Sequence, residues 1–418
     1  MKNQISITAS LLITVTSLLI FCLLGVSCTP GRDFDALLSA IVKPYKFSIA
    51  RWEFDAFFGK TKEAIPSNDN DKKVYDETDK VTEYFSYVQQ IKTLKSEIEA
   101  VKAGNNPGDL SSLETKLTEL QQQKAALENL VEGIIKKQIK ETLAQQGIFH
   151  PVDRYLGFKA NFPPINFKLE KPPHLLVVSP RDRIESMREI VLLQDISPED
   201  MENIETEVDQ LGVSSLVVGL GGFGGTYPAF VTNEASLRFT VDAAVEEWIH
   251  QYLFFKPLGF RYALDATGIT RNYEIAVMNE TVASMISKEI GAIITESYYP
   301  QHENNGSQSQ EQVSGFDFNQ EMREIRRAVD EYLALGEIEQ AEEFMEQKRQ
   351  YLTTKGYYLR KLNQAYFAFY GTYADRPTSI SPIGLELKKL RSQSTSLKEF
   401  LDTVAVMTSR QDLVLSLE

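Results

Sequence analysis

The chain has 418 residues, of which 43% are hydrophobic and 24% charged, and its formal net charge is −14. This length is enough for two or three domains of ordinary globular composition. The acidic balance argues against nucleic acid as a partner, and two cysteines cannot supply a disulfide framework. The patterns along the chain predict an α+β protein that is mostly helical.

Residues 1–31 are predicted to be a membrane anchor or signal segment. No charged residue lies between Lys2 and Arg32, and about twenty such residues span the ~30 Å hydrocarbon core of a bilayer. An uncleaved signal-anchor is favoured over cleavage with lipid attachment at Cys28, and ordinary signal cleavage is the third alternative. We expect the N-terminus inside and the bulk of the chain outside the cytoplasm.

Residues 32–73 form a membrane-proximal segment, whose aromatic residues around Trp52 either lie at the membrane interface or pack on the main domain. Residues 74–146 are predicted to be a coiled-coil hairpin, because apolar residues recur every three or four positions on both sides of a break at residues 103–108. Ser111 and Glu114 have the spacing of a capping box at the start of the second helix. The hairpin is interpreted as an arm for a coiled-coil partner or as a helical layer over a core.

Residues 147–300 are predicted to be the core. Strands are expected at residues 175–179, 189–193, 214–218 and 226–231, and a helix is expected from Ser197 with Pro198 as its first residue. A glycine-rich stretch at residues 219–225 is followed by a strand, which argues against a phosphate-binding loop. Helices are expected at residues 237–255 and 275–294. Residues 301–315 form a flexible polar loop, and residues 316–418 form a helical C-terminal domain.

The two core helices carry the residues that suggest chemistry. Glu246 and His250 are four positions apart, so they share one face of the first helix, with Glu247 beside them. Glu280 lies on the second helix in the stretch Asn-Glu-Thr-Val-Ala. Because unpaired buried charge is costly, a buried helix with these groups predicts a metal or a tight polar network.

This pair of motifs resembles the gluzincin metallopeptidases, in which a His-Glu-x-x-His helix is answered by a glutamate on a second helix. The resemblance implies that Glu246, His250 and Glu280 hold a zinc ion and that Glu247 is the general base. It also implies an oxyanion-stabilising tyrosine from farther along the chain, for which Tyr366 and Tyr370 are candidates by role. An edge strand from Tyr227 to Val231 would bind the peptide substrate through its main chain.

One position departs from the family pattern, because Glu246 stands where the family has its first histidine. The additional negative charge weakens the Lewis acid, makes a harder ion such as manganese more plausible, and leaves open that no metal is bound. The other histidines, His150, His174 and His302, are expected to be structural or at the surface.

The sequence thus predicts a membrane-anchored, metal-dependent peptidase. The alternative is a catalytically inactive, membrane-tethered scaffold that keeps a peptidase-like core and acts through its coiled coil.

Overall fold

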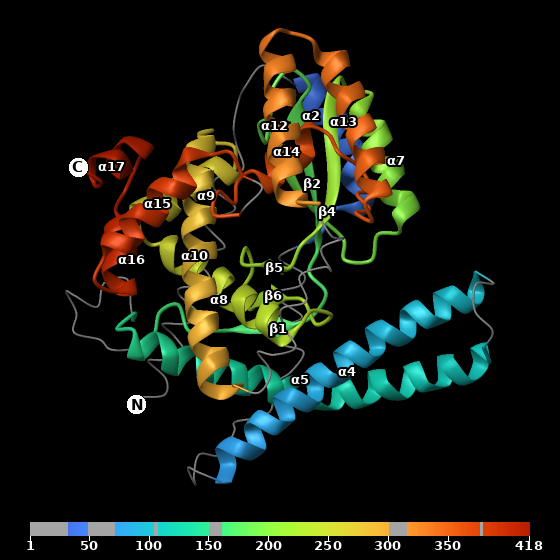
Figure 1. Ribbon diagram of the computed structural model, residues 1–418, viewed down its shortest axis with the longest axis vertical. Coiled ribbons are helices and arrows are strands. Elements are labelled where there is room, and N and C mark those ends of the chain that lie inside the picture. The colour runs from blue at the N-terminus through green and yellow to red at the C-terminus, as the bar shows by residue number, and fades with distance from the viewer. Residues whose placement is uncertain (1–31, 49–71, 104–107, 150–160, 301–315, 377–378) are drawn as a thin grey trace.

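The computed structural model describes residues 32–48, 72–103, 108–149, 161–300, 316–376 and 379–418 (Figure 1). These residues are mostly helical with two small sheets, which confirms the expected α+β class. The predicted anchor at residues 1–31, the aromatic segment around Trp52, the loop 301–315, His150 and His302 lie outside the described residues. Within the described ranges, no helix is both long and apolar enough to cross a membrane.

The first sheet is antiparallel, in the order β3-β2-β4, and lies in the upper part of Figure 1. Its strands are β2 (His174–Pro180), β3 (Arg188–Leu192) and β4 (Val213–Gly219), close to the predicted ranges. Side chains alternate between the two faces of a strand. One face of the sheet therefore packs on α2 (Arg32–Val42) and α7 (Pro198–Asp209), and the other packs on α14 (Gln364–Tyr370). A short 3-10 helix, η1 (Lys43–Tyr45), follows α2.

Two long helices, α12 (Phe318–Ala334) and α13 (Ile338–Thr354), pack together beside α14 around a core of their own. Gly336 and Gly356 follow their ends with φ of 77° and 86°, a backbone conformation that favours glycine. After α13 the chain is held to the sheet by Arg360, whose guanidinium donates two hydrogen bonds of 2.8 and 2.6 Å to the buried carboxylate of Glu205 on α7.

The second sheet contains β1 (Phe167–Leu169), β5 (Gly222–Phe223) and β6 (Ala229–Val231), in the order β1-β6-β5. The prediction that residues Tyr227 to Val231 form an edge strand is wrong. β6 is the central strand, because β1 pairs with it in parallel and β5 pairs with it antiparallel. Strand β1 lies sixty residues earlier in the chain, so local sequence patterns did not indicate that it would occupy this edge.

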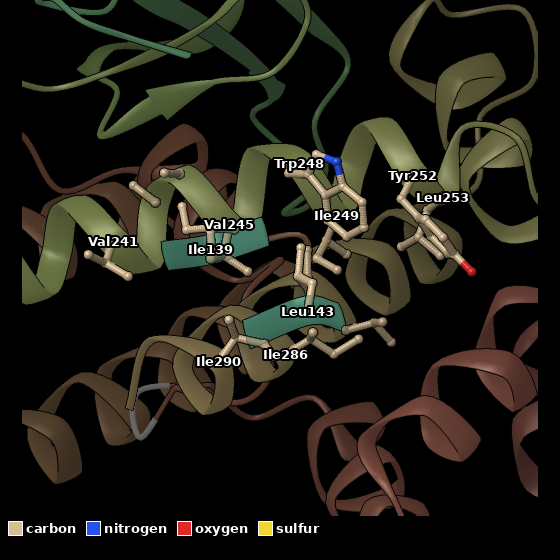
Figure 2. Close-up of a cluster of buried hydrophobic side chains, with 14 of the residues drawn as sticks. Ile139, Leu143, Val241, Val245, Trp248, Ile249, Tyr252, Leu253, Ile286 and Ile290 are labelled. Atoms are coloured by element: carbon tan, nitrogen blue, oxygen red, sulfur yellow. The ribbon is translucent and has the colours of Figure 1, made fainter. Parts of the chain in front are cut away.

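The largest core is formed around α8 (Leu237–Leu253), α9 (Pro257–Ala266) and α10 (Tyr273–Tyr298). Figure 2 shows apolar side chains of α8, α10 and the hairpin helix α5 gathered in one cluster. The α9 helix corrects the sequence analysis, which predicted no element between residues 257 and 272. Because α9 connects α8 to α10 in a short span, these two helices pack closely along much of their length.

The predicted hairpin is formed by α4 (Lys72–Lys102) and α5 (Leu110–Gln145) and extends away from the rest of the molecule in Figure 1. Its outer part has a small core of Ile91, Leu94, Ile98 and Leu120. The base of α5, in contrast, belongs to the main core. The predicted capping box is wrong: the N-cap of α5 is Asp109, whose carboxylate accepts hydrogen bonds from the backbone of residues 111 and 112.

Three helices end the chain: α15 (Pro382–Gln393), α16 (Leu397–Ala405) and α17 (Arg410–Leu415). All three lie in the part, residues 316–418, that was predicted to be helical. The last of them is held in place, because Ser409 and Asp412 form a capping box that begins α17 and Leu413 is fully buried.

Candidate functional site

Two helices with well-defined starts position the predicted site residues. The Ser236 side chain caps α8 and the Asn272 side chain caps α10, each by accepting a backbone hydrogen bond from three residues later. The helices approach closely where Gly291 of α10 faces the carboxylate of Asp242 on α8, since an added Cβ at that glycine would overlap the carboxylate. The close packing brings the polar faces of the two helices together.

Glu246, His250 and Glu280, hereafter the ligand set, meet at one point between α8 and α10. Their potential ligand atoms all lie within 4.8 Å of one another. The Nε2 atom of His250 lies 3.7 Å from the Oε2 atom of Glu280. This distance is too long for a hydrogen bond. It is close to the separation of roughly 3.3 Å that two ligand atoms have when each makes a bond of about 2 Å to one tetrahedral ion.

Asn279 determines which nitrogen of His250 is available. Its Oδ1 atom lies 2.8 Å from His250 Nδ1, and a carbonyl oxygen can only accept a hydrogen bond, so the network assigns the proton to Nδ1. The Nε2 lone pair then faces the two carboxylates. This is the tautomer that a metal-binding histidine needs.

A tyrosine that the sequence analysis missed completes the surroundings of Glu280. The hydroxyl of Tyr262, on α9, donates a 2.5 Å hydrogen bond to Glu280 Oε1, and its ring stacks on the His250 ring at 5.8 Å between centroids. Tyr262 therefore orients both residues. The only sequence signal was its place in the connection between the two motif helices.

Glu247 lies beside the ligand set, against the glycine-rich segment. A Cβ at Gly224 would lie 2.7 Å from Glu247 Oε2, and one at Gly222 would overlap the same carboxylate. The Gly224 backbone also hydrogen-bonds to Glu247. These glycines are therefore needed because the carboxylate occupies the space where their side chains would be. Gly222 belongs to β5, so the strand edge nearest to the site is β5 and not β6.

The site strongly perturbs proton affinities. Burial raises the pKa of Glu246 to about 7 and that of Glu247 to about 8, with the neighbouring carboxylates adding to both shifts while His250 opposes them. Burial alone would lower the pKa of His250, but Glu280, Glu247 and Glu246 raise it above its ordinary value. The carboxylates of Glu246, Glu247 and Glu280 therefore repel one another in a confined space. A bound cation would offset this repulsion.

The two tyrosines predicted for the oxyanion, Tyr366 and Tyr370, lie on α14 with ring centroids 4.5 Å apart and line a neighbouring cavity. Tyr373, three residues beyond Tyr370, is the tyrosine whose pKa is raised by the carboxylates of the site. Burial raises its pKa well above the ordinary value, and Glu280, Glu246 and Glu247 add to the shift. Its phenol therefore stays protonated and is available as a hydrogen-bond donor.

One exposed carboxylate of the first sheet, Glu189, is near enough to the site for the charge of Glu280 to act on it. Although part of the Glu189 side chain on β3 is exposed, the surrounding protein raises its pKa, and the charge of Glu280 adds to the shift. Arg271 acts in the opposite direction. The site therefore lies where the helices of the main core face the first sheet. By contrast, His174 is buried with Nδ1 3.0 Å from the Leu193 carbonyl and is structural, as expected.

The donor set fits a divalent cation, because it combines one imidazole nitrogen with two carboxylates and has its histidine in the required tautomer. No protein-family profile matches this chain, and neither the curated proteins nor the solved structures contain a significant match to it.

Proposed function

We propose that the ligand set holds a divalent cation and that the protein is a metal-dependent peptidase of gluzincin type. The observation that carries this proposal is the convergence of His250 Nε2 and the carboxylates of Glu246 and Glu280 from two helices within 4.8 Å. The predicted membrane anchor at residues 1–31 would place this activity outside the cytoplasm.

The residues around the ligand set have the properties that peptide hydrolysis needs. A bound cation would supply Lewis acidity toward a peptide carbonyl and toward water. Glu247, with a pKa near 8 in the absence of a cation, can accept and return a proton near neutral pH. Tyr373 can donate a hydrogen bond to an oxyanion. We assign this role to Tyr373 in place of Tyr366 or Tyr370.

The position of β5 supports a peptide as the substrate. It is an edge strand of its sheet, and its Gly222, with Gly224 just after it, lies directly against Glu247. An extended peptide that pairs with the free edge of this strand would run past the general base. The peptide-binding strand is therefore proposed to be β5 in place of residues 227–231.

Metal binding and cleavage are tested separately on the full chain. Zinc and manganese binding is measured by isothermal titration calorimetry after chelation, for the wild type, Glu280→Gln and Glu296→Gln. Glu296 is an exposed carboxylate on the same helix and is a matched control. We expect Glu280→Gln alone to weaken binding. Equal binding by all three proteins would contradict the proposed ligand set.

Cleavage is measured on a mixture of peptides, with Glu247→Gln as the test variant. We expect cation-dependent hydrolysis that this substitution abolishes while cation binding persists. A protein that binds neither ion would support the alternative of a non-catalytic tethered scaffold, and unchanged cleavage by Glu247→Gln would exclude the assigned mechanism.

A further inference from the structure

A second feature lies beside the ligand set and is not used by the proposed chemistry. A cavity of about 530 Å³ is bounded by α10, α12, α14 and the start of α15. Part of its wall is apolar or aromatic, with Val277, Phe318, Met322, Phe367 and Ile383. Three arginines also line it, and their partners differ.

Two of the arginines are already neutralised. Arg326 pairs with Asp330 at 2.9 Å, and Arg410 binds Glu386 at 2.7 Å and Glu274 at 3.2 Å. Arg376 is different, because no carboxylate forms an ion pair with it within the part of the chain that the structure describes. Its guanidinium lies 4.3 Å from the centroid of the Tyr373 ring, which leaves its edge free to bind.

The cavity and the ligand set are connected by one strap of chain. The Thr281 hydroxyl, next to Glu280, donates to the Thr372 carbonyl at 3.2 Å and accepts from the Ala374 backbone at 2.9 Å. Ser284 binds Asp375 at 3.1 Å one turn later. These bonds fix residues 371–376 along α10, with Arg376 lining the cavity and Tyr373 near enough to the carboxylates for their charge to raise its pKa.

The cavity also follows the same face of α10 as Glu280. Tyr273 and Val277 line it, and they lie seven and three residues before Glu280, which is the spacing of one helix face. Val277 and Glu280 are separated by about 4.5 Å along the helix axis. Val277, which lines the cavity, is therefore less than one helical turn from Glu280 along α10.

We infer that this cavity binds a carboxylate of the substrate through Arg376, with an apolar or aromatic body against the surrounding wall. The inference deepens the proposed peptidase function by naming a substrate class: peptides with a carboxylate next to the cleaved bond. The carboxylate is supplied either by the free C-terminus or by an acidic side chain, and a planar guanidinium binds either through two parallel hydrogen bonds.

The binding test does not depend on catalysis. N-acetylphenylalanine and N-acetylphenylalaninamide are titrated into the full-length protein in the presence of a chelator and followed by calorimetry. We expect the acid to bind at least about 10-fold more tightly than the amide, because the bond to Arg376 is charge-assisted. Arg376→Gln should abolish this difference and Arg376→Lys should retain part of it. Arg327→Gln, at an exposed arginine of α12, should leave it unchanged.

Equal binding of the acid and the amide, or an Arg376→Gln variant that is folded and keeps the preference, would overturn the inference. The source of the carboxylate is then determined by cleavage of peptides with a free or an amidated C-terminus, and with Glu or Gln beside the cleaved bond. A preference for the acid without any peptide cleavage would leave the carboxylate site standing and refute the peptidase function.

Discussion

The crowding of carboxylates in the ligand set predicts that the cation-free protein loses stability as pH rises. Burial raises the pKa of Glu246 from 4.5 to about 7. Between these values the folded protein binds more protons than the unfolded chain, so the free energy of unfolding falls with rising pH. A shift of about 2.5 units corresponds to about 3 kcal/mol for this carboxyl group.

His250 contributes in the same direction. Its raised pKa means that the stability it adds as a cation is complete below about pH 6.5 and is lost as pH rises through the folded-state value. Glu246→Gln removes the ionising carboxyl and one of the charges that raise the pKa of His250. The substitution should therefore flatten the dependence of stability on pH from both sources.

The assay is urea denaturation in a chelating buffer at several values between roughly pH 5 and pH 8. The raised pKa of Glu247 adds a further decline that all three proteins share. We expect Glu246→Gln to lose about 3 kcal/mol less over this range than the wild type and Glu296→Gln. Added zinc should restore stability to the wild type at the alkaline end. Parallel pH profiles for Glu246→Gln and the wild type would refute the claim that this carboxyl group is forced to ionise in a confined site.

Three further substitutions test the surroundings. Gly224→Ala would press a Cβ against the Glu247 carboxylate and should cost about 1–3 kcal/mol; urea denaturation should show little change for Gly219→Ala, which has only one ordinary contact. Tyr262→Phe removes the hydrogen bond to Glu280 and should weaken zinc binding by about 10- to 100-fold in calorimetry, whereas Tyr358→Phe, at an 82% exposed residue, should have no effect. Arg360→Ala leaves the buried Glu205 carboxylate without its bidentate partner and should lower the unfolding free energy by about 3 kcal/mol; a loss below about 1 kcal/mol would contradict this view of the pair.

The ligand set could be predicted from the sequence because its residues are placed by local helix geometry. Glu246 and His250 are placed by helical periodicity alone, and Glu280 lies on a neighbouring helix that a short connection forces to pack alongside. The start of α7 at Ser197 was also predicted, since capping chemistry is set by one or two residues.

The rest of the site depends on contacts between distant segments. Tyr262 belongs to a helix that was read as a connection, and Glu189 comes from the first sheet. Tyr373 lies three residues beyond Tyr370, and its position depends on the bonds of Thr281 to residues 372 and 374, which lie about ninety residues later in the chain. The strand order of the second sheet could not be predicted either. Pairing between residues 167–169 and 229–231 produces no periodic pattern in the sequence.

The buried Glu132 of α5 connects the projecting hairpin to the second sheet. One of its oxygens accepts a 2.9 Å hydrogen bond from the Leu169 backbone of β1, and the other lies 3.0 Å from Lys168 Nζ. As a 36-residue helix, α5 is a rod of about 54 Å. Its part before Lys124, which donates to the Asn233 carbonyl, extends away from the rest of the molecule in Figure 1. A force on its tip would pass through Glu132 to β1 and across β6 to β5, whose Gly222, together with the following Gly224, lies against Glu247. A force applied to the distant end of the hairpin would therefore reach the segment that surrounds Glu247, the residue proposed as the general base.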